Sequence, residues 1–188
     1  MRLGDRFKEL AEATRDSIVG REARSGTAVH GFHAVAPDPG DLATARRAVE
    51  LGAPDPYGLI TSDEVVALTG LPVGGPSLSY TDTDVAVRFE AEGGGRRWSL
   101  SVHAGHAVDE TTPFDPGAWY TLMVQQLGDA EGVGLGDEAL YRAGLLLVRG
   151  ADRAFCVRVD APADSPVRAW ALRLGARVLA RMASGVAG

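Results

Sequence analysis

Residues 83–103 read TDVAVRFEAEGGGRRWSLSVH, and this stretch decides the fold. On both sides of the three glycines, apolar residues alternate with polar or small ones; the apolar set is Val85, Val87, Phe89, Trp98, Leu100 and Val102. Alternation with a period of two places one set of side chains on a single face of a strand. Three glycines between two such runs form a turn. The stretch therefore predicts an antiparallel hairpin with one buried face.

The rest of the chain predicts helices and a second strand pair around this hairpin. Strands are expected at 140–149 and 153–160, joined by a turn at 150–152, and a further short strand at 27–35. Start and stop signals predict four helices: residues 41–51, a helix from the Thr61/Glu64 capping box to Gly70, one opening at Asp115-Pro116, and one opening at Ser165-Pro166.

The order of these elements indicates the fold class. Neighbouring strands pair locally, and no strand–helix–strand alternation occurs, which is typical of α+β proteins. We expect an antiparallel sheet of four to six strands with helices mainly on one face. In the helix that opens at Asp115, one face is expected to carry Trp119, Leu122, Met123 and Gln126.

The N-terminal segment, residues 1–24, predicts a separate amphipathic helix ahead of one α+β domain over 25–188. Apolar residues recur at helical spacing within 2–19, including Leu3, Phe7 and Leu10. The polar side of this helix mixes acidic and basic residues, whereas helices on membrane surfaces favour a cationic side. We expect it to pack on the domain or on a protein partner, as in a homodimer, with membrane association as the alternative.

Composition and charge exclude several classes of function. A chain of 188 residues with 45% hydrophobic residues fits one globular domain. A net charge of −6 and 6% aromatic residues argue against nucleic-acid binding. No window approaches the ~20 apolar residues of a membrane span, and no apolar stretch follows a basic start as in a secretory signal. We expect a cytoplasmic protein without a transmembrane segment, in which the lone Cys156 is a small apolar residue.

All four histidines fall in two H-x-x-H pairs with matching surroundings: His30, His33, His103 and His106. Each pair precedes an Asp-Pro-Gly triplet and a helical stretch, which indicates an internal half-repeat starting near residues 29 and 102. If the pairs lie on neighbouring strands, their imidazoles could bind a divalent metal. Residues i and i+3 of a strand point to opposite faces, so each pair supplies one ligand unless a bulge at Gly31 or Gly105 re-aims the other.

Three further patterns have structural interpretations that we favour over chemical ones. Gly132, Gly134 and Gly136 follow a helix and precede a strand, the reverse of a phosphate-binding loop, so they predict a backbone turn. Ser101 and His103 share the polar face of one strand, but the sequence identifies no orienting acid for them. The final helix carries an arginine stripe that is either a solvated face or a docking site for an acidic partner: Arg173, Arg177 and Arg181.

Four stretches of the chain form a pattern shared with a known group of domains: LITSDEVVALTG at 59–70, VGLGDEA at 133–139, the apolar run 145–149, and RVLARM at 177–182. Over residues 57–183 the chain resembles the actinobacterial sensor-like lipoprotein domains, which include extracellular sensor domains of some serine/threonine kinases. The resemblance implies an α+β sandwich with a sheet-lined cleft used for binding, and no catalytic residue carries over. Those domains are exported and have paired cysteines, which this chain lacks.

These observations predict a non-catalytic, cytoplasmic binding or interaction module for a protein or a small ligand, with no cofactor. The prediction depends on the lack of a complete catalytic constellation in the sequence and on the surplus N-terminal helix. The first alternative is a metal-binding protein or metal-dependent enzyme that uses the four histidines. The second is a peripheral membrane protein anchored by its first helix.

Overall fold

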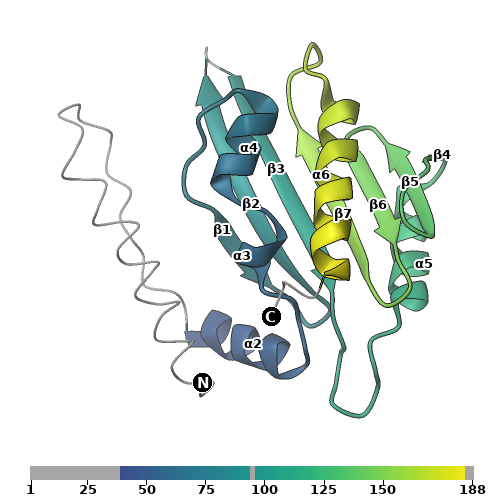
Figure 1. Ribbon diagram of the computed structural model, residues 1–188. Helices are drawn as coiled ribbons and strands as arrows, with labels where there is room; N and C mark the ends of the chain where they lie inside the picture. The colour runs from purple at the N-terminus through teal and green to yellow at the C-terminus, as the bar shows by residue number, and fades with distance from the viewer. Residues whose placement is uncertain (1–38, 94–95, 185–188) are drawn as a thin grey trace. The chain divides into compact units, whose positions relative to one another are not determined.

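The computed structural model describes residues 39–93 and 96–184 (Figure 1). Two predictions lie outside these residues: the helix at 2–19 with Leu3, Phe7 and Leu10, and the strand at 27–35 with His30 and His33. The half-repeat also depends on that segment, so it stays a prediction.

Within the described residues, seven antiparallel strands form one sheet in the order β1-β2-β3-β7-β6-β5-β4 (Figure 1). Their bounds are β1 Ser77–Tyr80, β2 Asp84–Gly93, β3 Arg96–Gly105, β4 Glu131–Gly132, β5 Glu138–Arg142, β6 Leu145–Arg149 and β7 Ala154–Asp160. The α+β class is confirmed, and so is the hairpin at 83–103, which forms β2 and β3. Seven strands exceed the four to six expected because β1 and β4 are too short for an alternating pattern to stand out, and because 140–149 contributes to two strands, β5 and β6.

The prediction of one strand over 140–149 is wrong, because this stretch contains a turn between β5 and β6. β5 and β6 are joined by Ala143 and Gly144, both with positive φ, at 46° and 86°. Two consecutive residues with positive φ make the tight hairpin turn whose twist matches that of paired strands. Asn-Gly or Asp-Gly is the usual signal for such a turn, and Ala-Gly does not give it.

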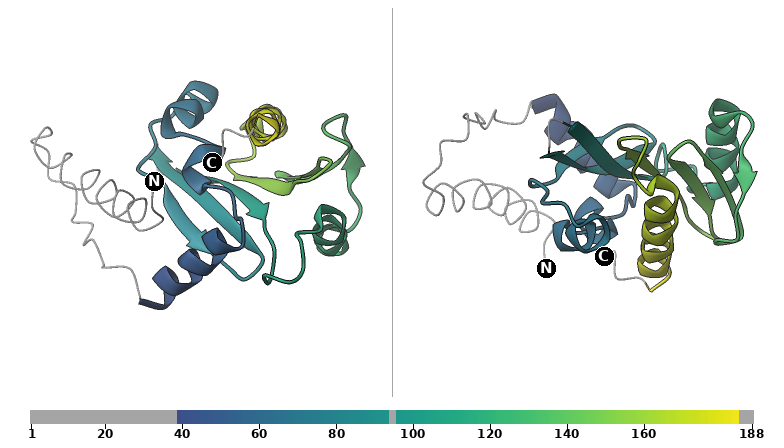
Figure 2. Two further views of the ribbon diagram at one scale, coloured as in Figure 1. Left: turned by 60° about the horizontal axis from the view of Figure 1, so that its bottom comes forward. Right: turned by 90° about the horizontal axis from the view of Figure 1, so that it is seen from above.

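Five helices occur in the described residues: α2 Pro39–Glu50, α3 Pro56–Leu59, α4 Ser62–Thr69, α5 Pro116–Leu127 and α6 Val167–Ala183. α2 begins two residues before the expected Asp41, because its first turn includes the Pro-Gly pair at 39–40. α3, α4 and α6 lie on one face of the sheet, and α5 lies on the other (Figure 2).

The main core lies between the sheet and the helices α3, α4 and α6. The apolar residues that alternate along β2 and β3 all face it, as do alternate residues of β6 and β7. From α6 the core receives the four residues expected from the sequence, Trp170, Leu174, Val178 and Met182. Burying each large apolar side chain contributes roughly 1.5–3 kcal/mol relative to leaving it exposed, so this face of the sheet dominates the stability of the fold.

α5 covers a smaller apolar cluster on the opposite face. Asp115 caps the helix as expected, since its Oδ1 accepts hydrogen bonds from the backbone N–H groups of Gly117 and Ala118 at 2.8 and 3.0 Å. The buried side of α5 differs from the prediction, because Leu122 is 52% exposed. The side that packs on the sheet instead carries Trp119, Tyr120, Met123, Val124 and Leu127.

The capping box of α4 is confirmed, and it also anchors α6. The backbone N–H of Thr61 donates to Glu64 Oε2 at 2.9 Å, and Gly70 ends the helix in the left-handed conformation. The other carboxylate oxygen of Glu64 lies 2.8 Å from Arg181 Nη2 and 3.7 Å from Arg177 Nη1. Glu64 therefore joins two helices that are far apart in the sequence.

We predict that Glu64→Ala destabilises the protein by about 2 kcal/mol, since it removes a helix cap and a charge-assisted hydrogen bond together. Asp63→Ala is the matched control: it removes a neighbouring, exposed carboxylate from the same helix turn. The control should cost less than about 1 kcal/mol. Urea unfolding of both variants measures the difference, and equal losses would contradict the linking role of Glu64.

Gly144→Ala should destabilise the fold by about 2 kcal/mol or more, because alanine is strained at a positive φ. In addition, its Cβ would collide with the carbonyl oxygen of Val159. Gly74→Ala serves as the control, since a Cβ there meets no atom within 4 Å. Unfolding in urea should separate the two variants, and a Gly144→Ala protein as stable as the Gly74→Ala protein would contradict this account of the turn.

Candidate functional site

On one face of the sheet, α5 covers β6 and its neighbouring strands. The part of the same face formed by β2 and β3 presents polar side chains. Cross-strand register sets these side chains in rows. Ser101 of β3 lies opposite Arg88 of β2 and, on its other side, opposite Arg158 of β7. Directly opposed residues have Cβ atoms about 4.5–5.5 Å apart, so two arginines flank this serine. Both arginines are exposed, whereas Ser101 is only 7% exposed.

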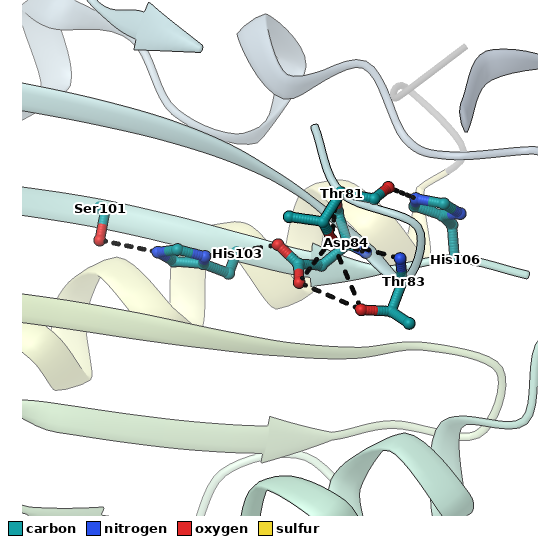
Figure 3. A network of polar contacts seen from close by, with 6 residues as sticks. All are labelled: Thr81, Thr83, Asp84, Ser101, His103 and His106. Atoms are coloured by element: carbon teal, nitrogen blue, oxygen red, sulfur yellow. Dashed lines mark hydrogen bonds and ion pairs between the residues drawn. The ribbon is translucent and has the colours of Figure 1, made fainter. Parts of the chain in front are cut away.

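Three polar side chains on this face are linked by two contacts (Figure 3). Ser101 Oγ lies 3.1 Å from His103 Nε2, and His103 Nδ1 lies 3.5 Å from Asp84 Oδ1. Ser101 and His103 are two residues apart on β3 and so point to the same side. Asp84 begins β2 opposite Gly105, which places its carboxylate diagonally beside His103. The arrangement orders a hydroxyl, an imidazole and a carboxylate in one line.

Asp84 is held in place by the turn that leads into β2. Its Oδ2 accepts hydrogen bonds from the hydroxyls of Thr81 at 3.0 Å and Thr83 at 3.4 Å. Partial burial acts to raise the pKa of Asp84, but hydrogen bonds from His103, Thr81 and Thr83, with the charge of His103, outweigh it and lower that pKa. The carboxylate is therefore ionised at neutral pH and can orient the imidazole.

Sequence reasoning found Ser101 and His103 but missed Asp84. Local spacing could not reveal it, because the acid lies on the other strand of the hairpin. The signal that was available is the hairpin register: pairing the two alternating runs around the glycine turn brings the start of β2 beside the end of β3.

His106 does not join this chain of contacts. It is 3% exposed, with Nδ1 2.7 Å from the carbonyl oxygen of Ala107 and Nε2 3.2 Å from that of Thr81. Both ring nitrogens of His106 are thus engaged with backbone, while His103 faces Asp84 and Ser101. Within residues 39–93 and 96–184, no group of three or more histidine, cysteine, aspartate or glutamate side chains is placed to hold a metal ion. The four-histidine metal site stays a prediction, since His30 and His33 are not described.

Cys156 is placed where the sequence predicted a small apolar residue. It is 3% exposed in the cluster beneath α5, and burial raises the pKa of its thiol to about 12. Because the thiolate is the reactive form, this cysteine is inert at neutral pH.

The glycine-rich stretch makes a backbone turn, as predicted. Gly136 has a φ of 65°, and a Cβ there would lie 2.6 Å from the carbonyl oxygen of Arg149. The next residue, Asp137, donates its backbone N–H to that same oxygen at 2.9 Å. The turn thereby brings the loop 132–135 alongside α6.

A shallow groove lies between this loop, β5 and α6, and we call it the α6 groove. It consists of two hollows of about 460 and 560 Å3 that share Arg168 and Leu172. Its walls are mostly apolar and include Val133, Leu135, Tyr141, Leu172 and Ala176.

Among the residues that the structure describes, Arg168 is the one charged side chain that lines the α6 groove. Its guanidinium pairs with the carboxylate of Glu131 and lies 5.6 Å from the centre of the Tyr141 ring. These two contacts hold the guanidinium in place while the side chain stays half exposed.

Two arginines of the predicted docking stripe are used inside the chain. Arg177 and Arg181 pair with Glu64, and Arg181 also donates to the carbonyl oxygen of Gly58 at 3.2 Å. Arg173 is exposed. The structure thus gives the stripe an intramolecular role, and a partner docked on it stays a prediction.

No protein-family model, curated protein or solved structure matches this chain. The resemblance to sensor-like lipoprotein domains therefore stays a prediction. Among the described helices, none has both the length and the apolar character that crossing a membrane requires.

We predict that Asp84→Asn lowers stability at pH 7 by on the order of 1 kcal/mol, because the ionised carboxylate loses its charge-assisted hydrogen bonds. A carboxylate with a lowered folded-state pKa stabilises the protein above its unfolded pKa, and this contribution disappears as pH falls through the folded value. The difference between wild type and variant should therefore shrink as pH falls through the lowered pKa of the folded-state Asp84 carboxyl, and vanish once that carboxyl is protonated. Asp82→Asn, an exposed neighbour, is the control. Thermal unfolding across pH measures both, and a pH-independent difference would contradict the assignment.

Proposed function

We propose that this protein is a binding module whose ligand occupies the α6 groove and is not chemically changed there. The ligand class that fits best is a small molecule with an apolar body and one acidic group. The observation that carries the proposal is the pair of adjoining hollows that share Arg168 and Leu172.

The size and lining of the groove support this choice. Ligand sites commonly enclose ~300–1,000 Å3, with apolar walls and a few polar groups that fix orientation. Each hollow falls in that range, and apolar side chains dominate the walls. Arg168 supplies a planar set of N–H donors suited to a carboxylate or a sulfonate. A bound acid would compete with Glu131 for these donors, and so the ion pair tunes affinity.

The proposal has two other parts that do not involve this groove: a protein partner and a location in the cell. A protein partner or a second copy of the chain would be held by the helix that the sequence predicts at residues 2–19, through Leu3, Phe7 and Leu10. A cytoplasmic location belongs to the same proposal and is supported by the mixed charge of that helix and by the lone, buried Cys156. Native mass spectrometry of untagged protein would report a retained ligand and the oligomeric state together.

We predict that anilinonaphthalene sulfonate, an apolar acid, binds folded wild-type protein saturably with one molecule per chain. Arg168→Ala should weaken this binding roughly tenfold to a hundredfold, which corresponds to the ~1.5–3 kcal/mol of a charge-assisted hydrogen bond. Fluorescence titration measures the affinity.

The matched control is Arg173→Ala, which removes an exposed arginine from the same helix. It should bind the probe as wild type does, and both variants should melt at the wild-type temperature. Binding that is absent, unsaturable or equally affected by the two substitutions would overturn the proposed groove.

A further inference from the structure

We propose that Ser101 is a nucleophile that cleaves small carboxylic esters, with His103 as its general base and Asp84 as the group that positions the base. The inference goes beyond the binding function proposed above. It concerns the opposite face of the sheet and shares no residue with the α6 groove, so either proposal can fail alone.

The contacts set the direction of proton transfer. Asp84 is ionised and accepts a hydrogen bond from His103 Nδ1–H across 3.5 Å, so the neutral imidazole carries its proton on Nδ1 and leaves Nε2 unprotonated. The hydroxyl of Ser101 then donates to Nε2 at 3.1 Å. This order of carboxylate, imidazole and hydroxyl is the one that activates a serine for acyl transfer, and it is recognised by geometry, whatever the fold or spacing.

Several contacts that hold Asp84 in place also fix the orientation of the His103 imidazole. Thr81 and Thr83 hold the Asp84 carboxylate, and β2 and β3 pair in register along their whole length. A histidine fixed in this way keeps one tautomer, which a solvated surface histidine does not. The structural role alone would not require Nε2 to face a serine hydroxyl.

Charge that develops on the ester oxygen would be stabilised by arginine side chains. The backbone N–H groups of β3 belong to the sheet ladder, so side chains must supply the donors. Arg88 and Arg158 flank Ser101 on the neighbouring strands. Arg88 uses one part of its guanidinium to pair with Glu90 at 2.9 Å, and a guanidinium carries five N–H donors in all. Both arginine side chains are long and exposed to solvent, so a small ester can pass between them to the hydroxyl of Ser101.

The covalent steps balance with water as the second substrate. Ser101 Oγ bonds to the ester carbonyl carbon while its proton passes to His103 Nε2. The bond from that carbon to the alcohol oxygen breaks, and Nε2 returns the proton to the departing oxygen. Water, deprotonated by the same nitrogen, then attacks the acyl carbon. The bond from that carbon to Ser101 Oγ breaks, and Nε2 returns the proton to Oγ, which releases a carboxylic acid and restores Ser101 and His103. Nothing is oxidised or reduced.

The test uses the full chain with two probes. A fluorophosphonate should label Ser101, as located by peptide mass spectrometry, and p-nitrophenyl acetate should be hydrolysed with release of nitrophenolate. Ser101→Ala should abolish the labelling and reduce turnover to the uncatalysed background. Ser99→Ala is the matched control, since Ser99 lies on the same face of the same strand; it should behave as wild type.

Two further variants separate chemistry from folding. His103→Ala should lower kcat by about a hundredfold or more, the usual range for loss of a general base. Asp84→Asn should lower kcat while leaving KM unchanged, which a merely structural role would not do selectively. Folded wild-type protein that resists the probe, a label on another residue, or turnover that survives in Ser101→Ala would each overturn the proposal.

Discussion

One face of β2, β3 and β7 is buried against α3, α4 and α6, and the rest of the molecule follows from that burial. The side chains on this face are almost fully excluded from solvent, including Phe89, Leu100 and Phe155. Because side chains alternate along a strand, burying one set directs the other set to the opposite side. A slip of one residue between β2 and β3 would turn the core outward, so the register is strongly fixed.

The polar chain of contacts depends on that register. Asp84, Ser101 and His103 belong to the set that must face away from the core, and pairing of Asp84 with Gly105 brings the acid beside the imidazole. The apolar residues of the hairpin fix its register by burial, and that register in turn positions the polar side chains on the opposite face. On the other face, the same sheet supports α6, whose outer side forms the wall of the α6 groove.

Much of this architecture could be predicted from the sequence because its signals are local. The hairpin, the capping box at Thr61 and Glu64, the Asp115 cap and the buried side of α6 each depend on residues close together in the chain. The predictions failed where long-range contacts decide. The turn at Ala143 and Gly144 is stabilised by the two strands that it joins. The buried side of α5 includes Tyr120 and Leu127 because the helix packs on an apolar cluster of the sheet that includes Leu147 and Cys156. Asp84 was missed for the same reason, since only strand pairing relates it to His103.

The tautomer of His103 is the most direct test of the contacts among Asp84, His103 and Ser101. It depends on the register of β2 and β3, on the ionised Asp84 carboxylate and on the contact with the Ser101 hydroxyl. A long-range proton–nitrogen correlation spectrum of the folded protein at neutral pH distinguishes the two ring nitrogens. His103 should carry its proton on Nδ1, facing Asp84, with Nε2 unprotonated and accepting a hydrogen bond from the hydroxyl of Ser101. A proton found on Nε2, or an imidazole that averages between tautomers as a solvated histidine does, would contradict it.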